Sequence, residues 1–373
     1  MLTAVGLLAC AASSAPTQAA ETVEYEVFYH HVLRNKTERE LTDVVVYLPV
    51  PASDDYQRIE GFRVERDGPV HISNRTDAFG TRIKRVAVAS IPPKGEAHVG
   101  FSCVVKLGPP VRIDLASRAQ GTREEIPEEI RELYTRDHPI FGLAAPELRE
   151  LAVRLLEDHP DPARRASAIH DLVASRLRYA GGGGWDPAPE VLERGSGSCS
   201  EFCYLFCALC RATGIPTRFV GASIFPAKSK LPFQDHGNHR WAEAWLPGLG
   251  WTPFDPTLDR AKPAKQDFVG THHGRTLIVT RTGDKSLQLG LSYVGANNRT
   301  SEVSRTTWFT WTQGTLARLA DAQRLLAEEA TRGAAVAALE ALVADAPGSR
   351  AAREAQALLA GLKRPAAPDG GGR

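Results

Sequence analysis

The sequence has almost no net charge and no long run of residues of one sign. Its 45 Lys and Arg residues nearly balance its 44 Asp and Glu residues, which leaves a formal net charge of +1 over 373 residues. Proteins that bind nucleic acids present a basic patch or stripe. The charge pattern therefore gives no indication of a nucleic-acid partner.

Long apolar runs are also missing beyond the N-terminus. No later segment has the roughly 18 consecutive apolar residues that indicate a membrane-spanning helix, so no further span is expected. Hydrophobic residues still make up 43% of the chain and charged residues 24%. This balance is typical of globular proteins and can supply a core without disulfide staples. The length predicts two or three domains.

Cysteine is scarce, and its distribution does not resemble a disulfide framework. Of six cysteines, one lies in the N-terminal segment, Cys103 stands alone in a strand-like run, and four crowd into one short segment. Those four are Cys199, Cys203, Cys207 and Cys210. A disulfide-stapled secreted scaffold would instead space its cysteines along the chain.

The first 20 residues have the composition of an export signal. An apolar stretch is followed by small and polar residues up to Thr17-Gln18-Ala19-Ala20, which resembles a cleavage zone. Leu7-Leu8-Ala9-Cys10 also resembles a bacterial lipoprotein box, in which Cys10 would carry a lipid and tether the protein to a membrane. We expect a periplasmic or secreted protein, with cleavage and lipid anchoring left as alternatives. An apolar tail without a targeting role is the remaining interpretation.

Residues 21–115 are predicted to form an all-β sandwich. Apolar and polar residues alternate over several short segments, among them Val23–Phe28, Thr42–Leu48 and His98–Lys106. Turn-forming pairs such as Asp67-Gly68 separate these segments. Several short strands at this spacing favour a small sandwich.

The pattern becomes helical after Leu115. Helical periodicity covers residues 126–136 and 145–157, and a further helix runs from Asp161 to about residue 177. After a glycine-rich break at 181–184, an almost wholly apolar run from Cys199 to residue 213 predicts a helix buried on all sides. Strand-like segments follow, beginning near residues 216, 241, 250, 276, 286 and 302.

Residues 313–364 are predicted to form a small helical appendage. The region is rich in Ala and Leu and is interrupted near Arg332-Gly333 and at Pro347-Gly348. The helices over 336–344 and 351–362 resemble one tetratricopeptide-like hairpin, but a solenoid needs several repeats. An appendage packed on the body is therefore the preferred interpretation. The Pro/Gly-rich tail, 365–373, is predicted to be disordered.

The sequence around Cys199 predicts a reactive thiol. Gly195-Ser-Gly-Ser delivers Cys199 to the first turn of the buried helix. Unsatisfied backbone N–H groups and the positive end of the helix dipole lie at such a position. Both stabilise a thiolate, which is the nucleophilic form of cysteine.

The other three cysteines of this helix are given a structural interpretation. Spacings of four, four and three residues place all four on one helical face, but thiolates stacked along about three turns cannot surround one metal ion. Neighbouring helical pairs also have Cβ atoms about 5–6 Å apart, too far for a disulfide. Cys203, Cys207 and Cys210 are expected to be small buried hydrophobes.

A thiolate nucleophile needs a base, and the base needs a partner that fixes its tautomer. His236 and His239 both precede the strand at Trp241, and Asp255 follows the next strand. Two antiparallel strands joined by the turn at 247–250 would bring His239 beside Asp255. His239 is preferred over His236 because it directly adjoins the strand, where a rigid backbone can hold its ring.

These segments together resemble the motif set of the transglutaminase-like superfamily. The similarity covers Gly-x-Cys199-x-Glu, Leu-Cys-Arg-Ala-Thr-Gly-Ile-Pro-Thr-Arg218, His239-x-Trp-x-Glu and Gly-Trp-x-x-x-Asp255-Pro-Thr. Four motifs in the same order over about residues 160–260 are specific, whereas any single one is not.

The resemblance implies an α+β fold with a papain-like core, in which the helix carrying the cysteine packs on an antiparallel sheet. That core would occupy residues 116–312, between the sandwich and the helical appendage. It also implies a catalytic triad of Cys199, His239 and Asp255. Arg240 departs from the pattern, because the residue after the motif histidine is often small. No acidic metal loop of the animal enzymes is found, so neither a metal nor a cofactor is expected.

The face of the strand that begins at His239 carries a further prediction. Alternation along the strand places Trp241 and Glu243 on the same face as His239. A buried carboxylate needs a partner, so Glu243 is expected to pair with a basic group, with Arg218 as the candidate. This pair would brace the site without joining the chemistry. A solvated glutamate at a sheet edge is the alternative.

Two classes of function remain open on the sequence. The first is an enzyme that transfers an acyl group from a peptide or carboxamide to its own thiol, then to water as a protease or amidase, or to an amine as a transamidase. Hydrolysis is slightly preferred. The second is a non-catalytic module that binds envelope proteins or glycans. The three triad residue types argue for the enzyme, with a protein or peptide as its substrate. The oligomeric state is not set by the sequence.

Overall fold

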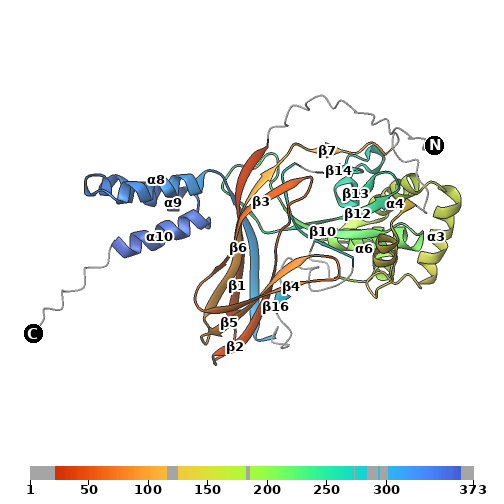
Figure 1. Ribbon diagram of the computed structural model, residues 1–373. Helices are drawn as coiled ribbons and strands as arrows, with labels where there is room; N and C mark the ends of the chain where they lie inside the picture. The colour runs from red at the N-terminus through yellow and green to blue at the C-terminus, as the bar shows by residue number, and fades with distance from the viewer. Residues whose placement is uncertain are drawn as a thin grey trace, which may run out of the picture.

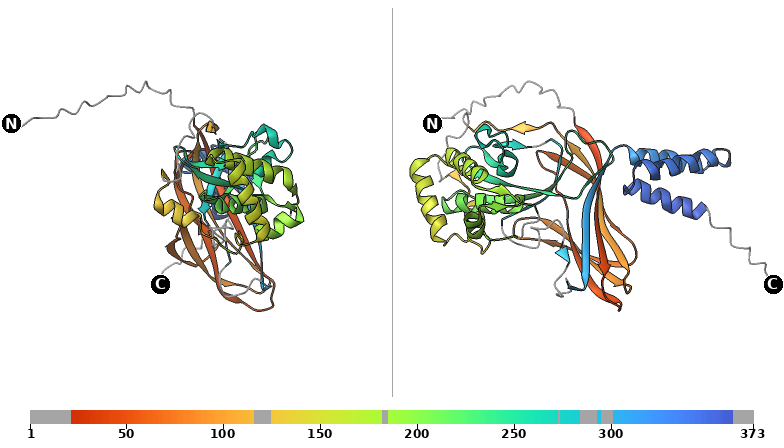
Figure 2. Two further views of the ribbon diagram at one scale, coloured as in Figure 1. Left: turned by 90° about the vertical axis from the view of Figure 1, so that its right-hand side faces the viewer. Right: turned by 180° about the vertical axis from the view of Figure 1, so that it is seen from behind.

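The computed structural model describes residues 22–115, 125–181, 185–272, 274–283, 293–294 and 301–362. The predicted export signal with Cys10, most of the glycine-rich break, most of the strand-like segment at 286–293 and the C-terminal tail lie outside these residues. Figures 1 and 2 show a long β-rich body, a mixed α/β lobe on one side of it and a helical arm on the other.

The β-rich body consists of two antiparallel sheets. The first has the strand order β11-β17-β1-β6-β3 and the second has the order β16-β2-β5-β4. The strands of the first sheet are Phe233–Asp235, Val303–Thr312, Val23–Asn35, Glu96–Leu107 and Gln57–Arg66. Those of the second are Tyr293–Val294, Leu41–Pro49, Arg82–Ile91 and Val70–Thr76.

Alternation along these strands produces one shared core. Val27 of β1 and Phe101 of β6 belong to the same buried cluster as Val46 of β2 and Val86 of β5. Side chains from the inner faces of two sheets therefore interdigitate, as in a sandwich. The N-terminal sheet-rich region predicted from the sequence is confirmed.

Three strands of this body come from far along the chain. Strand β17 pairs with β1 over ten residues, from Glu26 opposite Thr312 to Asn35 opposite Val303. Strand β11 then pairs with β17, and β16 pairs with β2. Segments that the sequence assigned to the core at 116–312 thus complete the sandwich sheets, and no simple cut of the chain separates the two regions.

The mixed lobe is built around a four-stranded antiparallel sheet with the order β13-β12-β10-β15. These strands are Gly250–Phe254, His239–Leu246, Thr217–Ile224 and Thr276–Thr282. Two short pairs flank it: β7 (Val111–Arg112) with β14 (Thr271–His272), and β8 (Arg178–Tyr179) with β9 (Ser196–Gly197). The helices are α2 (Glu128–Tyr134), α3 (Pro146–Asp158), α4 (Pro162–Arg176), α5 (Ala188–Arg194), α6 (Cys199–Ala212) and α7 (Pro256–Asp259), with the 3-10 turn η2 at Pro263–Lys265.

Helix α6 is the centre of this lobe. Its apolar side chains, among them Phe202 and Phe206, are completely buried. They share a core with Ala242 and Phe254 of the sheet and with Ile169 of α4. The helix is buried between the sheet and the outer helices, as its almost wholly apolar sequence predicts. The predicted α+β class is confirmed.

The C-terminal arm contains α8 (Thr315–Leu326), α9 (Arg332–Asp345) and α10 (Arg350–Leu362), with the 3-10 turn η4 at Glu329–Thr331. Its own small core includes Leu319, Leu339 and Ala355. Glu26 of β1 ties the arm to the sandwich, because its carboxylate accepts hydrogen bonds from the backbone N–H groups of Thr315 and Leu316 at the start of α8. Among the described residues, no helix combines the length and apolarity that a membrane crossing requires.

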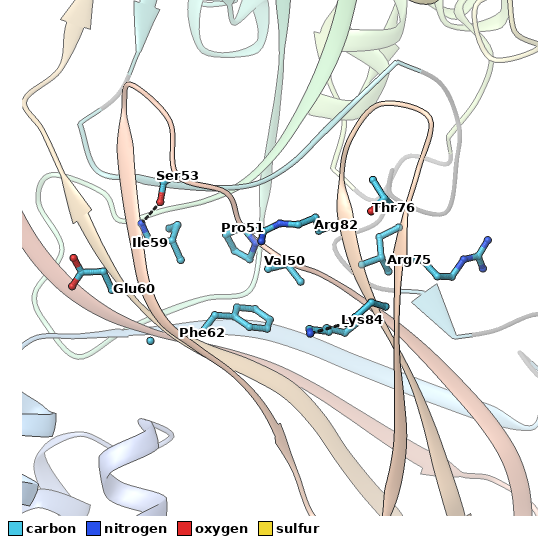
Figure 3. A pocket seen from close by; sticks show the side chains of 13 residues that line it. Val50, Pro51, Ser53, Ile59, Glu60, Phe62, Arg75, Thr76, Arg82 and Lys84 are labelled. Atoms are coloured by element: carbon cyan, nitrogen blue, oxygen red, sulfur yellow. Dashed lines mark hydrogen bonds between the residues drawn. The ribbon is translucent and has the colours of Figure 1, made fainter.

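A cleft of about 400 Å³ opens in the sandwich (Figure 3). Phe62 of β3 lies on one side of it, and Arg82 and Lys84 of β5 lie on the other. Neither Cys199 nor His239 lines this cleft. Both belong to the mixed lobe, where Cys199 begins α6 and His239 begins β12.

Candidate active site

Helix α6 begins at Cys199, as the glycine-rich approach predicts. The approach is held by Glu201, whose Oε2 accepts a hydrogen bond from the backbone N–H of Ser198 at 2.7 Å. Glu201 is itself completely buried and pairs with Arg194 at 2.6 Å. A Cβ on Gly197 would lie 2.7 Å from the Cβ of Glu201. Only glycine permits this close packing, which fixes the turn that presents the thiol.

His239 opens strand β12, directly opposite Ala222 of β10. Its Nε2 lies 2.5 Å from Oδ2 of Asp255. Because Asp255 takes Nε2, the other ring nitrogen is left for the thiol, and the imidazole lies within hydrogen-bonding range of Cys199. The structure thus brings together the three residues that the sequence singled out, from a helix start, a strand start and a strand end.

Asp255 is placed by the end of strand β13. It serves as the N-cap of α7, where its Oδ1 accepts a hydrogen bond from the backbone N–H of Leu258 at 3.2 Å. Its own backbone N–H donates to the carbonyl oxygen of Phe268 at 3.1 Å. Asp255 is 2% exposed. Hydrogen bonds therefore hold both the backbone and the side chain of Asp255, in addition to its contact with the imidazole of His239.

The electrostatics of the site favour an ion pair between the thiol and the imidazole. Burial lowers the pKa of His239, but the charge and hydrogen bond of Asp255 outweigh burial and raise the pKa to about 10. Burial raises the pKa of the Cys199 thiol, and its hydrogen bond and charge interaction with His239 more than offset this, so the pKa falls below its ordinary value. Both shifts favour thiolate with imidazolium over the neutral pair.

Arg240 adds a second positive charge beside Cys199. Its guanidinium donates to the hydroxyl of Ser200 at 2.9 Å and lies 5.2 Å from the ring centre of Trp185. Its charge and its backbone N–H both help to lower the pKa of Cys199. The residue that departs from the family pattern thus contacts the first turn of α6 and supports the thiolate.

His236 packs against the sandwich. It lies on the loop after β11, its Nε2 is 3.4 Å from Oε1 of Gln234, and its ring stacks on Trp308 of β17 at 6.0 Å. Because β11 pairs with the sandwich strand β17, the chain turns between positions 235 and 239. His236 therefore stays with the sandwich, while His239 begins the sheet of the mixed lobe.

Glu243 pairs with Arg218, as predicted from the motif. Its Oε2 lies 2.6 Å from a guanidinium nitrogen of Arg218, and it is 1% exposed. Burial raises the pKa of Glu243, but Arg218 and then Arg281 reverse the effect and lower it to about 2. The ring of Trp241 stacks against that of His239 with centroids 6.2 Å apart. The alternative of a solvated glutamate is excluded.

The sequence did not predict the rest of this brace. Arg281 of β15 lies 3.3 Å from Glu243, and Asp54 of the sandwich lies 2.7 Å from Arg281. Next to Asp54, the Gln57 side chain donates to and accepts from the backbone of Ile278, at 2.8 Å each. Asp54 in the loop between β2 and β3 and Gln57 at the start of β3 thereby attach the sandwich to β15, the edge strand of the sheet that carries His239. No local motif marks Asp54 or Gln57, since their partners lie more than 200 positions away.

The other cysteines that the structure describes are buried thiols. Cys203, Cys207 and Cys210 have no exposed surface, and they and Cys103 are free of disulfides. Burial raises the pKa of Cys207 to about 11 and of Cys103 to about 12. Over the described ranges, no group of three or more His, Cys, Asp or Glu side chains is arranged to hold a metal ion.

The site thus combines a cysteine at the start of a buried helix with a histidine that begins a strand of an antiparallel sheet and an aspartate that directly follows another. Residues 149–256 match the model of the transglutaminase-like superfamily, and this segment is a transglutaminase-like core. The match contains Cys199, His239 and Asp255.

The fold also resembles solved structures. A candidate cysteine protease from Cytophaga hutchinsonii has a TM-score of 0.59 at 16% identity, covering 79% of this chain and 91% of that one. At this identity the likeness shows the fold. The periplasmic domain of TgpA from Pseudomonas aeruginosa has a TM-score of 0.32 at 17% identity, covering 67% of this chain and 92% of that one. That score is too low to support a conclusion. No curated protein sequence matches the chain.

Proposed function

We propose that this protein is a thiol-dependent acyl-transfer enzyme that acts on peptide or carboxamide substrates. The observation that carries the proposal is the placement of Cys199 at the first turn of α6 against a His239 ring that Asp255 holds at 2.5 Å. A binding module would not need these three residue types in contact, nor a thiol with a lowered pKa.

The proposed first half-reaction forms a thioester. The Cys199 thiolate attacks the substrate carbonyl carbon, and the backbone N–H of Cys199 is the expected donor to the oxyanion. The C–N bond then breaks, and the His239 imidazolium gives its proton to the departing amine or ammonia. Asp255 accepts a hydrogen bond from Nε2–H of His239, so the proton that is transferred is the one on the other ring nitrogen, which faces the thiol.

The second half-reaction returns the thiol. Water or an amine attacks the thioester carbonyl while neutral His239 accepts the proton of the attacking group. The C–S bond breaks, and the thiolate–imidazolium pair is restored. Water as the acceptor gives a protease or amidase, and an amine gives a transamidase. We favour hydrolysis, because water is always present as an acceptor.

We further propose that the enzyme works outside the cytoplasm on proteins or peptides. Support comes from the N-terminal sequence, whose apolar stretch and Leu7-Leu8-Ala9-Cys10 are typical of exported proteins. Mass spectrometry of the mature protein from an expressing bacterium separates the options. A lipid adduct on Cys10 indicates anchoring, a start near residue 21 indicates cleavage, and an unprocessed N-terminus contradicts export by either route.

The activity itself is tested with a peptide library that contains glutamine. New amino termini identify a protease, ammonia without new termini identifies an amidase, and ammonia with incorporation of an added primary amine identifies a transamidase. The matched control is Cys199→Ala, which keeps the fold and removes the sulfur. Activity that survives in Cys199→Ala contradicts the proposal.

A further inference from the structure

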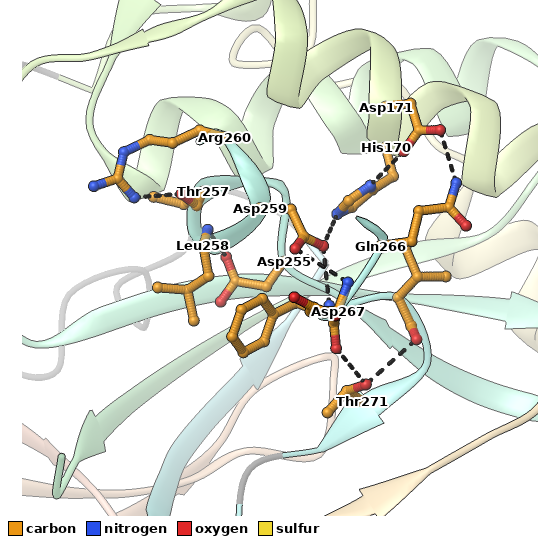
Figure 4. A network of polar contacts seen from close by, with 12 residues as sticks. His170, Asp171, Asp255, Thr257, Leu258, Asp259, Arg260, Gln266, Asp267 and Thr271 are labelled. Carbon is orange, nitrogen blue, oxygen red and sulfur yellow. Dashed lines mark hydrogen bonds and ion pairs between the residues drawn. The ribbon is translucent and has the colours of Figure 1, made fainter. Parts of the chain in front are cut away.

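A buried histidine lies beneath the segment that carries Asp255. His170 of α4 has no exposed surface, and its two ring nitrogens face two carboxylates. Nδ1 lies 3.1 Å from Asp171, and Nε2 lies 3.2 Å from Asp259 at the end of α7. Figure 4 shows His170 directed from its helix toward Asp259, with Asp255 on the far side of that carboxylate.

Asp259 also forms hydrogen bonds with the backbone that lies beside Asp255. Its two oxygens accept hydrogen bonds from the backbone N–H groups of Asp267 and Phe268, at 3.2 and 2.9 Å. The carbonyl of Phe268 in turn accepts the backbone N–H of Asp255 at 3.1 Å. Gln266 adds a side-chain hydrogen bond to Asp171 at 2.7 Å. The segment 255–268 is therefore tied to α4 at two points, through His170 to Asp259 and through Asp171 to Gln266.

In this network, a positively charged His170 lies between two negatively charged carboxylates, Asp171 and Asp259. Asp259 is 3% exposed, and a buried carboxylate is expensive without a counter-charge. Burial lowers the pKa of His170, but the hydrogen bonds and charges of Asp171 and Asp259 outweigh it and raise the pKa. A protonated His170 can hydrogen-bond to Asp171 through Nδ1 and form an ion pair with Asp259 through Nε2, whereas a neutral imidazole offers Asp259 no positive charge.

Helix α7 has only four residues, so it cannot by itself hold its N-cap in place. Asp255 must nevertheless stay 2.5 Å from His239, and displacements of about 1 Å in a catalytic arrangement can cost about 100-fold in rate. Some other part of the fold has to fix this segment. The network around Asp259 links this segment to α4 by side-chain contacts.

We infer that His170 and Asp259 are positioning residues for Asp255: together they hold the 255–268 segment so that its carboxylate meets His239. This inference rests on the proposed function. Neither residue touches the substrate, and both act on the reaction through Asp255 alone.

The test is a double-mutant cycle between His170→Gln and Asp255→Asn. On the wild-type background, His170→Gln should lower kcat by about 10- to 100-fold, because a displacement of about 1 Å in a catalytic arrangement can cost about 100-fold, with little change in KM. On the Asp255→Asn background, it should have almost no further effect, because its target is already gone. Equal fold losses on both backgrounds would overturn the inference.

A second readout needs no substrate. If Asp255 is displaced, the pKa of His239 falls and that of Cys199 rises, so the pH midpoint for alkylation of Cys199 by iodoacetamide should move to higher pH in His170→Gln. A loss of stability alone would leave this midpoint unchanged, and an unchanged midpoint together with wild-type kcat contradicts the inference. Asp259→Asn supplies an independent variant if His170→Gln does not fold, since it removes one of the two backbone acceptors and should give the same shift.

Asp171→Asn is the matched control. It removes the charge on the other side of His170 but leaves the Asp259 hydrogen bonds to Asp267 and Phe268 in place, so kcat should change by less than about threefold. A loss as large as that of Asp259→Asn would contradict the assigned route. The proposed function fails separately, through activity in Cys199→Ala, whereas the alkylation midpoint still reports on His170.

Discussion

Helix α6 carries four cysteines, and the pKa of the first is shifted in the opposite direction from the pKa values of the other three. Cys199 lies in the first turn, partly exposed, beside His239 and Arg240, and its pKa is lowered. One and more turns later, Cys203, Cys207 and Cys210 are fully buried, and burial raises their pKa values, that of Cys207 to about 11. The same side chain is thus a nucleophile candidate or a core residue according to its neighbours, and not according to its helix.

The largest expected effect separates these two ends directly. Cys199→Ala should abolish turnover, by about 10,000-fold or more, since loss of a nucleophile removes the covalent route. Cys210→Ala, at the far end of the same helix, should leave kcat within about threefold and cost about 1 kcal/mol or more of stability through a small cavity. Steady-state assays and urea unfolding measure both. Comparable losses of turnover in the two variants would break the comparison.

Asp255→Asn should make Cys199 resemble the interior cysteines more closely. Without the carboxylate, the pKa of His239 falls from about 10 toward its ordinary value, so the thiol loses its imidazolium partner and its own pKa rises. Turnover should fall by about 1,000- to 10,000-fold. The pH midpoint for iodoacetamide alkylation of Cys199, followed by peptide mass spectrometry, should rise. A midpoint equal to that of the wild type would show that Asp255 does not set the state of the pair.

Glu243→Gln should change stability far more than reactivity. The pKa of Glu243 is lowered from 4.5 to about 2 when the protein folds, so the paired carboxylate contributes stability above the unfolded pKa and loses it as the pH falls through about 2. The shift corresponds to about 3 kcal/mol at neutral pH. The difference in free energy of unfolding between wild type and variant should therefore be nearly constant above about pH 5.

That difference should shrink as the pH falls from about 4.5 toward 2, because the protonated glutamic acid then resembles glutamine. The alkylation midpoint of Cys199 should stay within about 0.3 pH units of the wild type, since Glu243 acts on the fold and leaves the ion pair intact. Urea unfolding at several pH values provides the measurement. A stability difference that grows at low pH would contradict the assigned pairing with Arg218.

Arg240→Gln should give the smallest effect. The guanidinium supports the thiolate only through its charge, and the Arg240 backbone N–H is retained in the variant. Alkylation of Cys199 near neutral pH should slow by about three- to tenfold, in keeping with a shift of up to about one pKa unit from one nearby charge. Arg240→Lys should recover most of the rate. If glutamine and lysine behave alike, the charge has no role and the side chain serves only to pack on Trp185.

Local patterns in the sequence were sufficient to predict the helices and strands that carry the candidate site residues. The N-cap and proline at Asp161-Pro162 predicted a helix that the structure has at Pro162–Arg176. The apolar run after Cys199 predicted a buried helix, and α6 is one. The order of the cysteine, histidine and aspartate motifs, together with the turn between β12 and β13, was enough to place His239 and Asp255 side by side. Each of these inferences uses contacts between neighbouring elements.

The contacts that hold the site were not predictable in this way. Alternation identified the strand at Val303–Thr312, but periodicity does not name a partner, and β17 pairs with β1 almost 280 residues earlier. For the same reason the sequence assigned β11 and β17 to the core, although both complete the first sheet of the sandwich. A lone His170 carries no signal, because a histidine on a helix is ordinary until two carboxylates are folded against it.

The sequence by itself determined the kinds of chemistry available and the local geometry that presents them. The glycines before Cys199, the strand that begins at His239 and the strand that ends just before Asp255 follow from short-range backbone preferences, which act within a few residues. Only the tertiary structure decided which charges became partners. The joining of Asp54 to Arg281, and of His170 to Asp259, depends on burial of residues from different elements. Burial strengthens each interaction between charges, and it arises only when the whole chain has packed.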